Sequence, residues 1–295
     1  MIGPGTERKS TMLRRLVEQN EVFVRPGCYD ALSAKILEAA GFQALGMSGY
    51  AVSVSQLGKP DVGLISLTET VRMCRYICNA VDIPVMVDAE TGYGNAINVM
   101  RTVEEIIGAG AGGLFIEDQV EPKRCGHVAG KQLISADEMV GKLRAADRVR
   151  QENDSDFVLM ARTDARGALG GSLNEALDRA KAYVDAGADI IFPEGLLCVD
   201  EIVRFVEEVP VPISYNRTGV SPMLGLNELE ALGVRMVANA SGALRAACRG
   251  LWDHSVAGGD EPPKPNDQLT YPMADLDKFL GREDIIKLSE EFIPV

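Results

Sequence analysis

Short runs of apolar, mostly β-branched residues alternate with longer amphipathic stretches along most of the chain. We expect strands at the short runs and helices at the stretches, whose apolar positions recur with the period of an α-helix. The predicted strands are residues 22–24, 44–47, 85–87, 113–116, 158–161, 190–192, 211–214 and 235–238. The predicted helices are residues 30–40, 67–81, 99–108, 136–150, 172–186, 198–208 and 225–232.

This regular alternation of strand and helix predicts the fold class. Strands that are apolar throughout are typical of a parallel sheet with both faces buried. Eight strand–helix units in succession favour closure into a (β/α)8 TIM-type barrel, an α/β fold, over an open doubly wound sheet. No Gly-x-Gly-x-x-Gly motif opens the first unit, which argues against a dinucleotide-binding fold.

The end of the chain departs from the pattern. Residues 258–267 are rich in Gly, Pro and Asp and are typical of a linker, and residues 273–280 and 284–292 have the pattern of two short helices. We therefore expect a barrel over residues 1–257, followed by a linker and C-terminal helices over residues 258–295. Because these helices are not needed to close a barrel, we expect them to pack on it or on a neighbouring subunit.

The amino-acid composition limits the kinds of molecule that we expect the protein to bind. The chain of 295 residues carries a formal net charge of -13, which disfavours binding to nucleic acid or to an anionic membrane. Its first residues lack the pattern of a signal peptide, and we expect a cytoplasmic protein. An anionic substrate would then need a local site of positive charge. Six scattered cysteines and two histidines indicate neither a disulfide framework nor a zinc site.

Polar side chains follow nearly every predicted strand, at the rim of a barrel where active sites are built. They are Ser48, Gly49 and Tyr50 after strand 2, Asp88 and Glu90 after strand 3, Glu117 after strand 4, Arg162 after strand 5, Glu194 after strand 6, and Asn216 and Thr218 after strand 7. Carboxylates crowded at adjacent strand ends favour Mg²⁺, with Mn²⁺ as an alternative, because hard oxygen ligands suit these ions. A second interpretation is that the acidic residues cap the following helices.

The segment after strand 4 contains a cysteine among cations. Cys125 is flanked by Lys123, Arg124, His127 and Lys131. Neighbouring positive charge lowers the pKa of a thiol, which suits proton transfer near neutral pH. The alternative is that this segment is a solvent-exposed basic loop in which the cysteine has no function.

At this segment the sequence resembles the isocitrate lyase / phosphoenolpyruvate mutase superfamily, and most closely its 2-methylisocitrate lyase-like branch. The motifs that carry the resemblance are KRCGH at 123–127, GKPD at 58–61, VDAETGYG at 87–94, FIEDQ at 115–119, ARTDA at 161–165 and FPE at 192–194. The resemblance implies Mg²⁺ held at Asp88, with Asp61, Glu90 and Glu117 around it. It also implies a dimer or a dimer of dimers in which the last helix is exchanged between subunits.

The resemblance further implies a reaction. A small 2-hydroxy di- or tricarboxylate, similar to methylisocitrate or an alkylmalate, would be cleaved at a carbon–carbon bond into a 2-oxo acid and a second carboxylate. Cys125 would be the proton donor, with Lys123, His127, Arg162 and Glu117 in the catalytic set. The substrate would lie against Ser48, Gly49, Tyr50, Asp88, Arg162, Glu194, Asn216 and Thr218. Alternatives are oxaloacetate hydrolysis or decarboxylation, cleavage of a phosphorus–carbon bond, or a barrel without catalytic activity.

Three positions depart from the branch. Gly46 stands where the lyases usually carry a Tyr, Glu90 stands where Asp is usual, and Tyr50 replaces a small residue. We expect Tyr50 to fill the space or to act as the base, and we expect the substrate to differ from 2-methylisocitrate.

Overall fold

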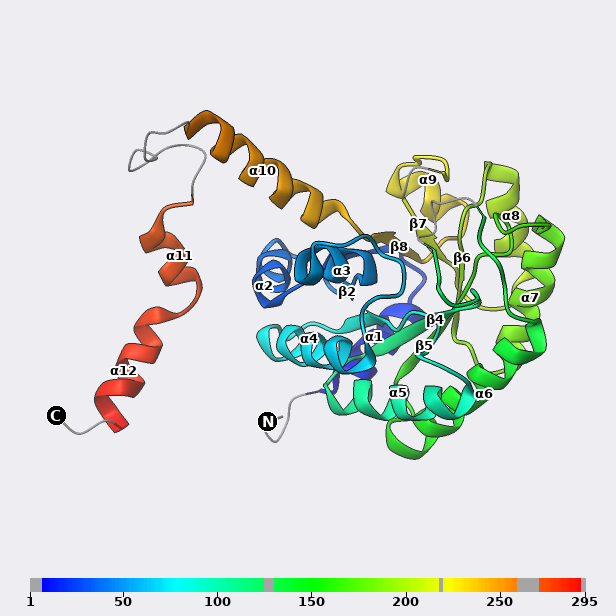
Figure 1. The fold of residues 1–295 in the computed structure, drawn as a ribbon, viewed down its shortest axis with the longest axis horizontal. Helices are drawn as coiled ribbons and strands as arrows, with labels where there is room; N and C mark the ends of the chain where they lie inside the picture. Colours follow the sequence, from blue (N-terminus) through cyan, green and yellow to red (C-terminus); the bar gives the residue numbers. More distant parts are fainter. Residues whose placement is uncertain (1–6, 125–129, 218–219, 259–270, 293–295) are drawn as a thin grey trace. The chain divides into compact units, whose positions relative to one another are not determined.

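The computed structural model describes residues 7–124, 130–217, 220–258 and 271–292. Eight parallel strands follow one another around a nearly closed barrel, in the order β6-β5-β4-β3-β2-β1-β8-β7 (Figure 1). The strands are β1 (Phe23–Cys28), β2 (Leu45–Met47), β3 (Val85–Asp88), β4 (Gly113–Glu117), β5 (Val158–Thr163), β6 (Ile190–Pro193), β7 (Ser214–Asn216) and β8 (Met236–Asn239). The predicted (β/α)8 fold is confirmed.

The barrel closes between β6 and β7 through a single parallel bridge. Ile191 pairs with Ile213, and the Ile191 N–H donates to the Pro212 carbonyl at 3.1 Å. The predicted seventh strand, residues 211–214, overlaps β7 only at Ser214. Proline has no N–H to donate to a sheet, so regular pairing starts after Pro212.

Helices cover the outside of the barrel. They are α2 (Ala31–Ala39), α3 (Gly49–Leu57), α4 (Leu67–Ala80), α5 (Ala96–Gly108), α6 (Ala136–Asn153), α7 (Leu173–Asp185), α8 (Val199–Glu208) and α9 (Leu226–Ala231). Polar caps start several of them; the Ser66 hydroxyl, for example, accepts from the Glu69 N–H while the Glu69 carboxylate accepts from the Ser66 N–H. All seven predicted helices are present, and α3 is an addition.

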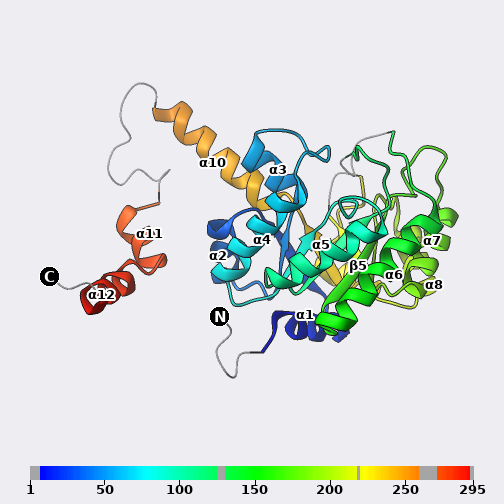
Figure 2. The same ribbon diagram turned by 60° about the horizontal axis from the view of Figure 1, so that its bottom comes forward.

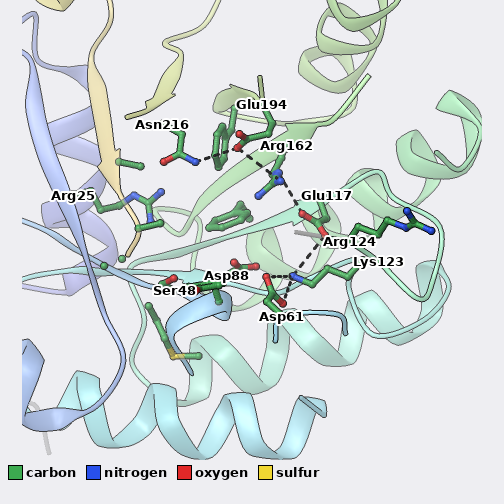
Figure 3. A pocket seen from close by; sticks show the side chains of 18 residues that line it. Arg25, Ser48, Asp61, Asp88, Glu117, Lys123, Arg124, Arg162, Glu194 and Asn216 are labelled. Carbon is green, nitrogen blue, oxygen red and sulfur yellow. Dashed lines mark hydrogen bonds and ion pairs between the residues drawn. The ribbon is translucent and has the colours of Figure 1, made fainter. Parts of the chain in front are cut away.

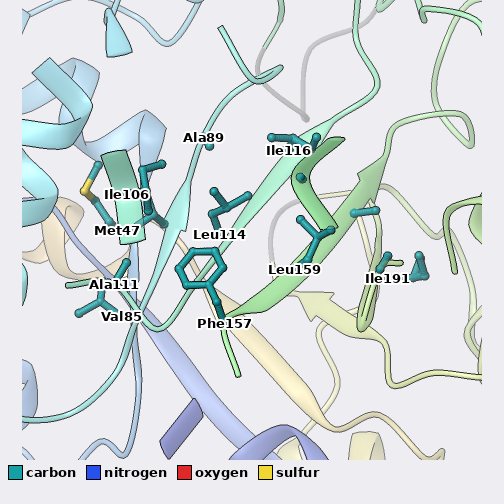
Figure 4. Close-up of a cluster of buried hydrophobic side chains, with 14 of the residues drawn as sticks. Met47, Val85, Ala89, Ile106, Ala111, Leu114, Ile116, Phe157, Leu159 and Ile191 are labelled. Carbon is teal, nitrogen blue, oxygen red and sulfur yellow. The ribbon is translucent and has the colours of Figure 1, made fainter. Parts of the chain in front are cut away.

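Two apolar cores hold the barrel together. One lies between strands and helices and includes Leu114, Phe157 and Leu159 together with Ile106 of α5 (Figure 4). The other fills the barrel interior with side chains such as Phe23, Met86, Phe115, Val158, Met160 and Phe192. Strands whose two faces both meet apolar side chains are buried along their whole length, as β4 and β5 are.

Helix α1 (Lys9–Glu18), which the sequence did not predict, closes the amino-terminal end of the barrel (Figure 2). Leu13 and Val17 join the interior core. Arg14 donates from Nη2 to the Phe157 carbonyl at the start of β5. The opposite, carboxyl-terminal end is thus the open one, and the polar strand ends lie there.

The chain divides into two compact units, residues 1–244 and 245–295. The second unit contains most of α10 (Gly242–Gly258), together with α11 (Met273–Phe279) and α12 (Arg282–Phe292). The two predicted C-terminal helices are therefore confirmed as elements. Within the described ranges, no helix has both the length and the apolar character that crossing a membrane requires.

Candidate active site

A pocket opens at the carboxyl ends of the strands (Figure 3). It brings together side chains that lie far apart in the sequence and that the sequence predicted to share a site. These are Ser48, Tyr50, Asp61, Asp88, Glu117, Lys123, Arg162, Glu194 and Asn216. Arg25, Arg124, Phe115 and Phe192 also line it.

Lys123 lies at the centre of the predicted acidic cluster. Its ammonium nitrogen lies 2.8 Å from Asp61 Oδ1 and 3.9 Å from Glu117 Oε1, and it also pairs with Glu90. The four side chains are buried. Glu90 reaches this position from a left-handed backbone conformation (φ 56°), which is uncommon for a residue with a side chain and often occurs at functional sites.

Burial and charge act in opposite directions on these groups. Burial raises the pKa of the Glu117 carboxyl to about 8, although Arg162 and Lys123 oppose the shift. Burial also raises the pKa of Glu90 well above its ordinary value, with Lys123 opposing it. For Lys123, burial alone would lower the pKa, but the surrounding carboxylates outweigh burial and hold it well above the ordinary value. The ammonium is therefore held in its charged form.

The residues after β2 form the start of α3 and not a free turn. The Ser48 hydroxyl caps the helix by accepting from the Ala51 N–H at 3.2 Å, and the Gly49 N–H donates to Asp88 Oδ2 at 3.1 Å. A Cβ at position 49 would lie 2.6 Å from Glu90 Oε1 and 2.8 Å from Asp88 Oδ2. Glycine is thus needed where α3 approaches the acidic cluster.

Arg162 is held on β5 by two buried acids. Its Nε donates to Asp164 Oδ2 at 2.9 Å, its Nη2 donates to Asp164 Oδ1 at 3.1 Å, and Glu117 Oε2 lies 3.3 Å from Nε. Burial alone would raise the pKa of Asp164, but Arg162 and Lys131 outweigh it and lower the pKa to about 2. This fixed guanidinium faces Glu194 across the pocket at 3.8 Å.

Asp118 and Gln119, directly after β4, support this arrangement. Asp118 Oδ1 accepts from the Asp164 N–H at 2.9 Å, and its Oδ2 accepts from the Thr163 hydroxyl at 2.8 Å. The Gln119 amide accepts from the Arg124 N–H and donates to the Arg124 carbonyl, both at 2.9 Å. Asp164 and Asp118 were missed as functional candidates, although both stand in the motifs ARTDA and FIEDQ that drew attention to their neighbours.

Arg25 is the most notable residue that the sequence did not single out. It lies on β1, is 5% exposed, and lines the pocket (Figure 3). A Cβ at Gly46 would lie 2.2 Å from its Nη1. Two features could have indicated it: Arg25 is a charged residue in an otherwise apolar strand, and Gly46 on the neighbouring strand leaves room for its side chain.

Comparison with known proteins identifies the family. Residues 13–257 match the phosphoenolpyruvate phosphomutase family. The 2,3-dimethylmalate lyase of Eubacterium barkeri is 44% identical over 82% of this chain and 83% of its own. The 2-methylisocitrate lyase of Aeropyrum pernix is 45% identical over 78% of this chain and 73% of its own.

The chain belongs to the phosphoenolpyruvate mutase / isocitrate lyase superfamily. A solved structure agrees: a phosphonopyruvate hydrolase in complex with oxalate and Mg²⁺ superposes with a TM-score of 0.85 at 30% identity, covering 98% of this chain and all of its own. The predicted superfamily is confirmed. The names of the two lyases support the predicted activity, a carbon–carbon lyase.

The superfamily resemblance implies a metal ion in this pocket, whose lining includes several carboxylates. Buried carboxylate oxygens are the ligands Mg²⁺ prefers, and Glu117 Oε1 accepts no hydrogen bond from any described residue. Among the described residues, however, no three Asp, Glu, His or Cys side chains gather closely enough to hold one metal ion. The set therefore fits Mg²⁺ with few direct protein ligands and several waters, the usual arrangement for this ion.

Three predicted site residues of this superfamily member lie outside the described residues: Cys125, His127 and Thr218. Among the other predicted site residues, Glu90 pairs with Lys123 of the acidic cluster, and the Gly49 N–H donates to Asp88. The remaining predicted residues line the pocket itself.

Proposed function

We propose that this protein is a Mg²⁺-dependent carbon–carbon lyase that cleaves a small 2-hydroxy dicarboxylate of the alkylmalate type. The observation that carries the proposal is the pocket in which buried carboxylates around Asp88 lie beside the fixed guanidinium of Arg162. Of the substrates named for the relatives, 2,3-dimethylmalate is a dicarboxylate of this class, whereas 2-methylisocitrate is a 2-hydroxy tricarboxylate.

Asp88 would hold the metal, directly or through water, with Asp61, Glu90 and Glu117 around it. Mg²⁺, or Mn²⁺ in its place, would polarise the 2-hydroxyl oxygen and the adjacent carboxylate of the substrate. Both Asp88 oxygens already accept one backbone hydrogen bond, from Gly49 and Glu90, which holds the carboxylate in one orientation.

Substrate binding would depend on donors from several strands. Arg162 presents a planar fork suited to a carboxylate. Asn216 donates from its Nδ2 to Glu194 Oε2 at 3.1 Å, while its Oδ1 accepts no hydrogen bond from a described residue. Ser48 keeps its hydroxyl proton available, because its oxygen serves as the acceptor in the helix cap. Gly49 and Thr218 complete the proposed binding set.

The proton steps would use the loop after β4. When the substrate hydroxyl loses its proton, the carbon–carbon bond breaks to give a 2-oxo acid and a carbanion. Cys125 would donate its thiol proton to that carbanion, with Lys123 and His127 in the same catalytic set. Tyr50, which lines the pocket and is 36% exposed, would accept the hydroxyl proton in place of the Tyr usual at position 46.

The test is an assay of released 2-oxo acid with Mg²⁺ and a panel of 2,3-dimethylmalate, other alkylmalates, 2-methylisocitrate and oxaloacetate. We expect cleavage of an alkylmalate, and a loss of at least about a hundredfold in kcat for Cys125→Ser, the scale of a lost general acid. Turnover of oxaloacetate alone, unchanged in Cys125→Ser, would instead establish the hydrolase or decarboxylase alternative. No Mg²⁺-dependent binding of oxalate would indicate a barrel without activity.

We also propose that residues 258–295 mediate a homo-oligomer, a dimer or tetramer, by exchange of the C-terminal helices, with residues 1–257 as the catalytic domain. The support is apolar exposure in the second unit, where Trp252, Met273, Ile285 and Phe292 are each more than half exposed. Sedimentation of the full chain and of a chain ending at residue 257 tests this. The cytoplasmic location stays a prediction.

A further inference from the structure

Arg25 is a buried cation that points into the pocket without a polar partner. It projects from β1 toward the pocket centre (Figure 3), and it is 5% exposed. Among the described residues, no side chain or carbonyl forms a hydrogen bond or ion pair with its guanidinium, and its Nε is buried without an acceptor. Its packing partner is the Phe115 ring, whose centroid lies 5.6 Å from Cζ.

The other cations that reach the acidic part of the pocket are already neutralised. Lys123 pairs with Asp61 and Glu90, and Arg162 pairs with Asp164 and Glu117. The charge of Asp88 acts on Arg25, but no Asp88 oxygen lies within ion-pair distance of it. Burial lowers the pKa of Arg25 to about 10, so the side chain still carries its charge at neutral pH.

An unpaired cation in a buried position is costly, and a ligand that supplied a carboxylate would remove that cost. The position is also maintained by a specific neighbour. Because a Cβ at Gly46 would lie 2.2 Å from Arg25 Nη1, the guanidinium occupies space that a side chain on β2 would otherwise fill. Arg25 and Gly46 therefore work as a pair.

We propose that Arg25 binds the second carboxylate of the substrate, the one that a 2-oxo monocarboxylate lacks, and so makes the site selective for dicarboxylates. This inference rests on the proposed function for the location of the first carboxylate, near Asp88 and Arg162. Arg25 on β1 and Arg162 on β5 enter the pocket from strands four apart in the eight-stranded barrel. A short dicarboxylate held between them would meet a guanidinium at each end, and only Arg25 would bring a charge that no described residue already pairs. The flat guanidinium suits a two-point contact with a carboxylate.

The experiment measures the dissociation constants of malate and pyruvate by calorimetry with Mg²⁺ at fixed ionic strength. The variants are Arg25→Gln and Arg25→Lys, and the control is Arg204→Gln, which removes the same charge from a half-exposed pair with Glu208, away from the residues that line the pocket. We expect Arg25→Gln to weaken malate binding relative to pyruvate binding by about tenfold or more, the scale of a charged hydrogen bond. Arg25→Lys should recover part of the loss, and the control should leave the ratio unchanged.

An unchanged malate-to-pyruvate ratio in Arg25→Gln, or a parent protein that binds no malate, would overturn the inference. General damage to the pocket would weaken the binding of both ligands, so it would not produce the expected change in the ratio of the malate and pyruvate dissociation constants. Gly46→Ala gives an independent check: its methyl group would displace the guanidinium and should shift the ratio in the same direction without removing charge. If Gly46→Ala has the same malate-to-pyruvate ratio as the parent, the proposed pairing of Arg25 with Gly46 is wrong.

The outcome is separable from that of the proposed function. If the ratio shifts but no alkylmalate is cleaved, the proposed lyase activity fails and the role of Arg25 stands. If the parent cleaves an alkylmalate and Arg25→Gln does so with the same KM, the role of Arg25 fails and the lyase activity stands.

Discussion

Replacing Lys123 by Met tests whether its ammonium balances the charge of the acidic cluster. The substitution keeps an unbranched chain of similar length but removes the cation that pairs with Asp61 and Glu90. Lys123 is 3% exposed and the acids around it are buried as well, so water cannot take over its role. Asp61 would then lose its buried counter-charge, and the pKa values of Glu90 and Glu117, which Lys123 lowers, would rise further.

The structure sets the size of the expected effect. Removing one partner of a buried ion pair costs about 3–5 kcal/mol, because the other charge is left uncompensated. For a domain of this size, 1 kcal/mol corresponds to about 2–4 °C, so Tm should fall by about 6–20 °C. A matched control is Lys181→Met: Lys181 pairs with Glu208 at 2.8 Å but is 43% exposed, and such surface pairs contribute about 0–1 kcal/mol.

The assay is thermal unfolding followed by circular dichroism, with and without Mg²⁺ at constant ionic strength. Without the ammonium, the carboxylates should bind Mg²⁺ more tightly, so Mg²⁺ should raise the Tm of Lys123→Met more than that of the parent. A Tm change no larger than that of Lys181→Met would refute the view that Lys123 neutralises the cluster. An equal Mg²⁺ effect in variant and parent would refute the competition between the ammonium and the metal.

Two further changes test the site. In the folded protein the pKa of Asp164 is about 2, below its unfolded value, so its ion pair with Arg162 stabilises the fold above the unfolded pKa and loses its effect as the pH falls toward 2. Urea unfolding should therefore show Asp164→Asn less stable than the parent at about pH 6, with a smaller difference at about pH 3; equal differences would contradict this. Tyr50→Phe should lower kcat by about a hundredfold if the phenol is the base, with little change in Tm, and full turnover would remove that role.

Much of the architecture could be predicted from the chain because its causes are local. Runs that are apolar on both faces become parallel strands, and the periodic stretches between them become helices, so every strand was expected near its observed position. The exceptions also have local reasons. Helix α1 is mostly polar and buries little beyond Leu13 and Val17, and α3 starts at a Ser-Gly pair that is equally typical of a turn.

The site could be predicted only in part. The order of strands around a barrel implies that Asp88, Glu117, Arg162 and Glu194 share one rim, and they line one pocket. Which charges pair across that rim depends on distances between side chains that are far apart in the sequence. The sequence indicated a metal among the acids, whereas the folded chain brings the ammonium of Lys123 into the same cluster.

The sequence by itself determined the barrel, the rim on which its polar residues gather and the superfamily, because these follow from periodicity and from contiguous motifs. Tertiary structure alone decided the role of Arg25. In the sequence, Arg25 is a cation directly after the predicted strand 22–24, and Gly46 stands out only because the lyases usually carry a tyrosine there. The parallel pairing of β1 with β2 brings them into contact, since a glycine on one strand leaves space that only the facing side chain can fill.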